Sequence, residues 1–106
     1  MSLDGQKILI TGTYGFLGRF LANKFSKLGA KIYGIGHGEL SSKELVDNGI
    51  SKYICSDLNI STLKETCERP NKIIHCASSA SVPYSVFYPK EDFERNVNST
   101  LAVLEF

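Results

Sequence analysis

A glycine-rich segment near the N-terminus, residues 7–19 with the sequence KILITGTYGFLGR, constrains the fold of this chain more than any other feature. It begins with a short apolar run and Thr11, and glycines follow at positions 12, 15 and 18. An apolar pattern of helical period starts directly afterwards, at Leu17, Phe20, Leu21, Phe25 and Leu28. This order predicts a buried strand, a tight turn and a helix.

Each of the three glycines has a predicted role in binding a phosphate. Gly12 permits a sharp turn where a Cβ would clash. Gly15 lets a phosphate approach the backbone, and Gly18 lets the helix lie close to its strand. The helix N-terminus then offers free N–H groups and a partial positive charge to a pyrophosphate. The alternative is a glycine-rich turn that binds no ligand.

Strands and helices alternate along the rest of the chain. Gly29 is a good C-terminal cap for the first helix, and a strand over residues 31–35 completes a βαβ unit with a right-handed crossover. The pattern then predicts a helix over 42–48, a strand over 52–55, a helix over 60–68, a strand over 71–76 and a helix over 91–106. The fold class is therefore α/β.

The composition fits one small domain with one core, because the chain has only 106 residues. Its formal charge is +1 and no basic patch stands out, so we expect neither a nucleic acid nor a membrane as partner. No apolar run is long enough to span a bilayer, and the N-terminus lacks the apolar core of a signal peptide. Three cysteines without a C-x-x-C pair and two histidines favour a cytoplasmic protein without a metal site.

Two stretches resemble the extended short-chain dehydrogenase/reductases, the branch that includes NAD-dependent nucleotide-sugar epimerases and dehydratases. The first is TGTYGFLG, residues 11–18. The second runs from the fourth predicted strand into the last helix, where Ser78 and Ser99 replace a usual Ala and Gly. Its matching positions are His75, Ala77, Val82, Ser85, Pro89, Asn96, Thr100, Leu104 and Glu105.

This resemblance implies the N-terminal half of a Rossmann-type doubly wound parallel sheet with strand order 3-2-1-4. It also implies a bound NAD or NADP and, in the whole enzyme, a nucleotide-sugar substrate. Asp57 and Leu58 would lie beside the adenine, and Ala77 and Ser78 would lie beside the nicotinamide ribose. The residues implied for the pyrophosphate turn are Gly12, Tyr14, Gly15, Phe16, Leu17 and Gly18.

The end of the second predicted strand departs from the commonest NAD-binding pattern. An acidic residue there usually receives the ribose hydroxyls, but this chain has His37 after Gly36, and Glu39 follows late. His37, with residues 41–43, could receive a 2′-phosphate, or backbone groups could hold a plain ribose. A solvated loop is the third possibility. Asp57 has an alternative role as the cap of the following helix, for which Ser61 competes.

The catalytic groups of the resembled family are a Ser and a Tyr-x-x-x-Lys pair, and no Tyr-x-x-x-Lys occurs in these residues. We therefore expect cofactor-binding residues here but no catalytic ones, in the N-terminal part of a longer enzyme. His75 has no visible orienting partner and is expected to be a structural residue at a strand end, while Tyr84 and Tyr88 are expected to pack within a loop. A non-catalytic dinucleotide-binding redox sensor is the alternative function.

The last helix is amphipathic, and we expect Phe93, Val97, Leu101 and Leu104 to face the sheet. In the resembled family this helix forms part of a four-helix bundle between two subunits. That resemblance implies a homodimer in the whole protein. A second apolar strip beginning at Val103 and Phe106 could be the partner surface, or all of these side chains could serve one core.

Overall fold

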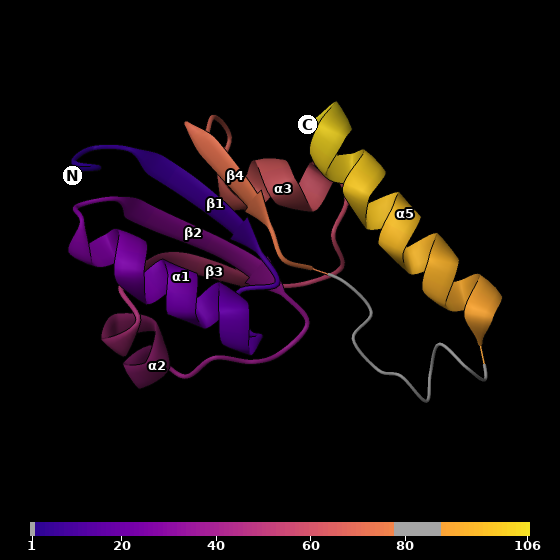
Figure 1. Cartoon of the computed structure of the whole chain (residues 1–106), viewed down its shortest axis with the longest axis horizontal. Helices are drawn as coiled ribbons and strands as arrows, with labels where there is room; N and C mark the ends of the chain where they lie inside the picture. Colours follow the sequence, from indigo (N-terminus) through magenta and orange to yellow (C-terminus); the bar gives the residue numbers. More distant parts are fainter. Residues whose placement is uncertain (1, 78–87) are drawn as a thin grey trace.

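The chain folds around a four-stranded parallel sheet in the order β3-β2-β1-β4, which confirms the order that the family resemblance implies (Figure 1). The structure is a computed structural model and describes residues 2–77 and 88–106, without the side chains of residues 92, 93 and 95. The elements are β1 (Lys7–Thr11), α1 (Phe16–Lys27), β2 (Lys31–Gly36), α2 (Ser42–Asp47), β3 (Ile50–Cys55), α3 (Ile60–Thr66), β4 (Lys72–His75) and α5 (Pro89–Glu105).

The sheet separates two hydrophobic clusters, which makes the fold a three-layer α/β/α arrangement. Because alternate side chains of a strand point to opposite faces, Ile8 and Ile10 of β1 pack with Ala22 of α1 on one face. Leu9 of β1 packs with Leu63 of α3 on the other face. Figure 1 shows α1 and α2 on one side, with α3 and α5 on the opposite side. Because all the strands are parallel, their carboxyl ends lie at the same edge of the sheet, where open α/β sheets bind ligands.

The ends of α1 and α3 follow from their local hydrogen bonds. Gly29 follows the C-cap of α1 with φ of 97°, and the N–H of Gly29 and of Ala30 donate to carbonyls of the last turn, as in a Schellman motif. Asn59 caps α3, because its side chain accepts from the N–H of Thr62. Neither Asp57, whose alternative role was to cap this helix, nor its competitor Ser61 is therefore the N-cap. The helix ends at Thr66, earlier than predicted, since Cys67 has extended backbone angles.

The orientation of α5 also differs from the prediction. Ala102, Val103 and Phe106 pack against the cluster that contains Leu63, whereas the expected sheet-facing side chains are exposed at Val97, Leu101 and Leu104. Residues three and four apart share one side of a helix, so Val97, Leu101 and Leu104 form one face. Ala102, Val103 and Phe106 lie on the opposite side. The expected assignment of core face and outer face is therefore reversed, and the side chain of Phe93 lies outside the described part.

Within residues 2–77 and 88–106, no helix combines the length and the apolar character needed to cross a membrane.

Candidate functional site

The glycine turn between β1 and α1 brings two glycines into close backbone contact and leaves the third open. Gly12 has φ of 73°, and a Cβ there would lie 2.7 Å from the backbone nitrogen of Ala77. A Cβ on Gly18 would meet the carbonyl oxygen of Gly12 and would lie 2.8 Å from Thr13 Cα. Among the described residues, a Cβ on Gly15 would meet only the Gly12 oxygen, at 3.4 Å. Gly12 and Gly18 are thus needed for packing, whereas the described part of the chain leaves room at Gly15.

The first turn of α1 has the properties of an anion site. Its N-cap is Gly15, no side-chain hydrogen bond caps it, and it contains no acidic residue. By contrast, the first turns of α2 and α3 are closed by capping boxes from Ser41 and Asn59. The N–H groups at the start of a helix have no intrahelical partners and carry a partial positive charge. The backbone at Phe16, Leu17 and Gly18 therefore fits a pyrophosphate.

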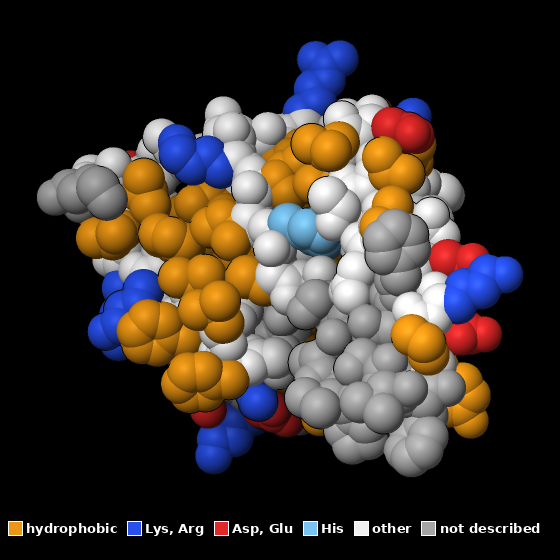
Figure 2. Space-filling view, turned by 45° about the vertical axis from the view of Figure 1, so that its right-hand side comes forward, with side chains coloured by type: hydrophobic (Ala, Val, Ile, Leu, Met, Phe, Trp, Pro, Cys, Tyr) orange, Lys and Arg blue, Asp and Glu red, His pale blue; other side chains and the backbone are white. Residues whose placement is uncertain are grey.

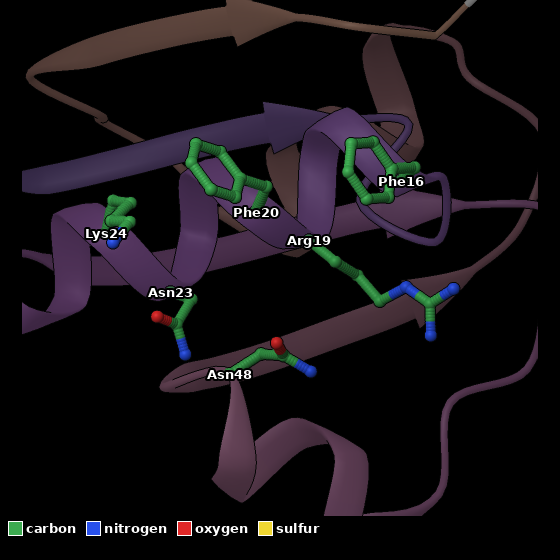
Figure 3. Close-up of a pocket in the computed structure, with 6 residues that line it drawn as sticks. All are labelled: Phe16, Arg19, Phe20, Asn23, Lys24 and Asn48. Atoms are coloured by element: carbon green, nitrogen blue, oxygen red, sulfur yellow. The ribbon is translucent and has the colours of Figure 1, made fainter.

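The side chains of this turn point away from the sheet or pack on the neighbouring loop. Phe16 is 85% exposed, and its ring stacks on that of Phe20 with centroids 6.4 Å apart. Figure 3 shows both rings on α1, at a groove of about 370 Å³ that Arg19, Asn23, Lys24 and Asn48 also line. The exposed side chains of Phe16 and Leu17 leave the backbone of this turn as the part predicted to bind a phosphate.

Tyr14 connects the glycine turn to the loop after β2. A Cβ on Gly38 would overlap the Tyr14 ring, so the ring lies directly against that glycine. The guanidinium of Arg19 lies 5.4 Å from the ring centroid and also pairs with Glu44 of α2 at 3.3 Å. These contacts hold the loop after β2 beside the glycine turn, which assigns the Tyr14 side chain a supporting role.

His37 and Asp57 come together at the ends of β2 and β3. His37 Nε2 lies 3.6 Å from Asp57 Oδ1, and both side chains are largely exposed. Tyr53 fixes the same loop by donating from its hydroxyl to the carbonyl of Gly38. Burial, with smaller contributions from Cys55 and Tyr14, raises the pKa of Tyr53 to about 12, so it remains a neutral donor.

Two residues of the predicted adenosine side have structural functions as well. The hydroxyl of Ser41 caps α2 and accepts from Glu44 N, so the predicted use of Ser41 for a phosphate competes with the cap. The Leu58 side chain packs against the cluster on the α3 side of the sheet. Its predicted contact with adenine is made by the backbone N–H and is compatible with that packing.

The end of β4 holds a hydrogen-bond chain that sequence reasoning did not find. Thr11 Oγ1 lies 2.6 Å from His75 Nδ1 and also accepts from the N–H of Ala77 at 3.1 Å. His75 Nε2 lies 3.1 Å from Thr100 Oγ1 on α5. The expectation that His75 has no orienting partner is therefore wrong. Both threonines lie in the two stretches that resemble the family, but their pairing requires the β1–β4 register and the position of α5.

Burial lowers the pKa of His75 below its ordinary value. Burial disfavours the charged ring, so the neutral imidazole is favoured. Ser78 and the predicted loop residues from 79 to 87, Tyr84 among them, lie outside the described residues. Tyr88 is described and is exposed just before α5.

Hydrophobic side chains are also exposed on the surface of the molecule, among them residues of α5. Figure 2 shows them gathered on the left of the face that it presents, with a smaller group at the upper right. On α5, an open groove of about 320 Å³ is lined by Asn96, Val97, Thr100 and Leu101. Leu104 on the same side of the helix is 76% exposed.

Comparisons with known proteins find relatives of this chain. The chain is 29% identical to protein CapI of Staphylococcus aureus and 34% identical to CDP-paratose 2-epimerase of Salmonella typhi. Each alignment covers 94% of this chain but only 33% and 32% of those relatives. This chain therefore spans about a third of the length of the relatives that it matches.

Solved structures show the same fold. An epimerase of Methanothermobacter thermautotrophicus superposes with a TM-score of 0.79 at 27% identity, over 96% of this chain and 31% of the other. The NAD complex of Thermus thermophilus UDP-glucose 4-epimerase gives 0.76 at 28% identity, over 94% and 33%. Residues 8–106 match the NAD dependent epimerase/dehydratase family. Because that match extends over nearly its whole length, the chain belongs to the NAD-dependent epimerase/dehydratase family.

Proposed function

We propose that this chain is the dinucleotide-binding part of an enzyme that epimerises or dehydrates nucleotide sugars with NAD or NADP. The observation that carries the proposal is the first turn of α1, where, among the described residues, a Cβ on Gly15 would have a single neighbour at 3.4 Å and no side chain caps the helix. Family membership supports it. So do a relative named CDP-paratose 2-epimerase and the structure of Thermotoga maritima UDP-glucose 4-epimerase with UDP-glucose.

The residues of this chain bind and orient the dinucleotide. The backbone N–H groups at the start of α1 hold the pyrophosphate. The Asp57 carboxylate accepts from the adenine amine, while the Leu58 N–H donates to the ring. Ala77 and Ser78 let the nicotinamide ribose approach the backbone. The bound nicotinamide supplies the chemistry by accepting a hydride from a sugar carbon.

The choice between NAD and NADP rests on the loop after β2. His37 stands where an acidic residue would receive the ribose hydroxyls. No carboxylate at that position repels a 2′-phosphate, but Asp57 lies 3.6 Å from the His37 ring. Both cofactors therefore belong in the binding experiment.

Proton transfer to or from the sugar requires groups that these 106 residues do not supply. In the resembled family the Tyr-x-x-x-Lys pair performs it, because the lysine lowers the pKa of the tyrosine. No Tyr-x-x-x-Lys occurs in this sequence. We therefore expect these residues alone to bind a dinucleotide without turnover, and we assign the epimerase or dehydratase activity to the whole protein. The three unpaired cysteines support a reducing, cytoplasmic location.

A homodimer of the whole protein is part of the same proposal. The outer face of α5 exposes Val97, Leu101 and Leu104, while its opposite face packs on the core. In a two-fold dimer both subunits present the same patch. The exposed face of α5 thus replaces Val103 and Phe106 as the proposed contact.

Calorimetric titration with NAD and with NADP tests the binding function directly. We expect one saturable site per chain for at least one of them. The absence of saturable binding up to several millimolar of either cofactor would reject the proposal. A second assay distinguishes a redox sensor from an enzyme by measuring the product formed when the whole protein is incubated with nucleotide sugars. Lack of turnover there, despite binding, would favour the sensor.

A further inference from the structure

We propose that Thr11, His75 and Thr100 form a positioning chain that fixes the backbone of Ala77 for the nicotinamide half of the cofactor. The chain joins three elements that are distant in sequence, since Thr11 ends β1, His75 ends β4 and Thr100 lies on α5. This inference rests on the proposed dinucleotide site. None of the three side chains is assigned a contact with the cofactor, so each acts through the residue that it holds.

The hydrogen bonds that link Thr11, His75 and Thr100 all run in one direction. Thr100 Oγ1 donates its only proton to the carbonyl of Asn96 at 2.9 Å, so it accepts from His75 Nε2–H at 3.1 Å. In a neutral imidazole the other nitrogen is an acceptor. His75 Nδ1 therefore accepts from the Thr11 hydroxyl at 2.6 Å, and Thr11 Oγ1 accepts from the Ala77 N–H at 3.1 Å.

The direction requires a neutral ring with its proton on Nε2. A protonated ring would donate from both nitrogens, and the fully buried Thr11 hydroxyl would lose its acceptor. A buried hydroxyl without an acceptor destabilises the arrangement. Burial favours the neutral ring in the same sense, because it lowers the pKa of His75.

The position of Ala77 matters because it touches the glycine turn. A Cβ on Gly12 would lie 2.7 Å from the Ala77 nitrogen, so the two backbones are in contact with little room for movement. Thr11 and His75 are also direct neighbours in the parallel register of β1 and β4. A displacement of Ala77 would change the nicotinamide side of the proposed site, while the start of α1 would keep its geometry for the pyrophosphate.

The test compares two ligands on matched variants of α5. Thr100→Val removes the acceptor with little change of shape, and Thr100→Ser restores a hydroxyl. Ser99→Ala is the control, because the Ser99 hydroxyl also donates to the Asn96 carbonyl, at 3.1 Å, without a contact to His75. NAD and ADP are titrated by calorimetry, since ADP lacks the nicotinamide riboside.

We expect Thr100→Val to weaken NAD binding about three- to tenfold, the factor of one ordinary hydrogen bond, and to leave the affinity for ADP unchanged. Thr100→Ser and Ser99→Ala should bind NAD as the wild type does. Equal NAD affinity in Thr100→Val, or equal losses for NAD and ADP, would overturn the positioning role. If the wild type binds neither NAD nor ADP, the dinucleotide site itself is rejected.

Nitrogen NMR of the imidazole rings gives a readout that a merely structural role would not move. The chain has only two histidines, and the exposed His37 is an internal reference. We expect His75 to occupy the Nε2–H tautomer in the wild type and to become a mixture of tautomers in Thr100→Val. An Nδ1–H tautomer, or a protonated ring at neutral pH, would contradict the proposed direction of these hydrogen bonds.

Discussion

Gly15→Val should separate cofactor binding from folding. The backbone angles at Gly15, φ of −68° and ψ of 168°, suit any L-residue, and its Cβ would meet a single atom of residues 2–77 and 88–106, at 3.4 Å. Added stiffness of the unfolded chain favours the variant by up to about 1 kcal/mol, while valine is a poor N-cap. We therefore expect the free energy of unfolding to change by less than about 1 kcal/mol.

The loss of binding should be much larger. The valine side chain would occupy the space where the pyrophosphate approaches the first turn of α1. Losing one charge-assisted hydrogen bond costs about 1.5–3 kcal/mol, which raises the dissociation constant for NAD about ten- to hundredfold. Calorimetry measures this constant, and urea unfolding shows whether the variant is folded. An unchanged affinity for NAD in a folded Gly15→Val variant would refute the phosphate-binding role.

Gly18→Ala provides the contrast, since it adds less volume at a position without room. Its Cβ would lie 2.8 Å from Thr13 Cα and 2.9 Å from the carbonyl carbon of Gly12. Backbone atoms cannot rotate away as a flexible side chain can. Overpacking of this kind costs about 1–3 kcal/mol, so this variant should lose stability. A fully stable Gly18→Ala would show that the turn is more pliable than the structure indicates.

Three further predictions concern the other parts of the site. Asp57→Ala should weaken NAD binding by about 1–3 kcal/mol, because it removes a hydrogen bond to adenine. The control in calorimetry is Glu39→Ala, which changes an exposed carboxylate. Equal affinity for NAD in the two variants would reject the adenine role. Because the pKa of His75 is lowered in the folded state, its contribution to stability is complete above the unfolded value of 6.5. That contribution should decline as the pH falls from 6.5 toward the native pKa, and urea unfolding that shows a gain of stability over this range would contradict the assignment. In the whole protein, Leu101→Glu should reduce the mass measured by sedimentation to that of a monomer, whereas Asn98→Glu should not; a dimer that survives Leu101→Glu would exclude this face.

The order of strands and helices could be predicted from the sequence because local signals agree along the chain. Short apolar runs mark the strands, and Gly29 marks the end of α1 through its positive φ. The boundaries were less certain where caps compete. Asn59, Asp57 and Ser61 are all suitable N-caps of α3, and only the path of the backbone selects Asn59.

The site could be predicted only where one local motif defines it. The glycine turn depends on contacts within residues 12–18, which the motif spacing indicates, whereas its contact with Ala77 depends on the position of β4 and could not be predicted. The two faces of α5 could not be distinguished, since both carry apolar residues and only tertiary packing selects the one with Val103 and Phe106. The partners of His75 were missed because they come from β1 and α5, which are 64 and 25 residues away in sequence.

The central claim is that the first turn of α1 binds the pyrophosphate of a dinucleotide, and an amide NMR titration with NAD tests it most directly. The account predicts saturable shifts of the amide signals of Gly15, Phe16, Leu17 and Gly18, with a second group of shifts at Asp57 and Ala77. ADP should shift the signals of the α1 turn and of Asp57 but not that of Ala77. Saturable shifts that leave residues 15–18 unchanged would contradict the account.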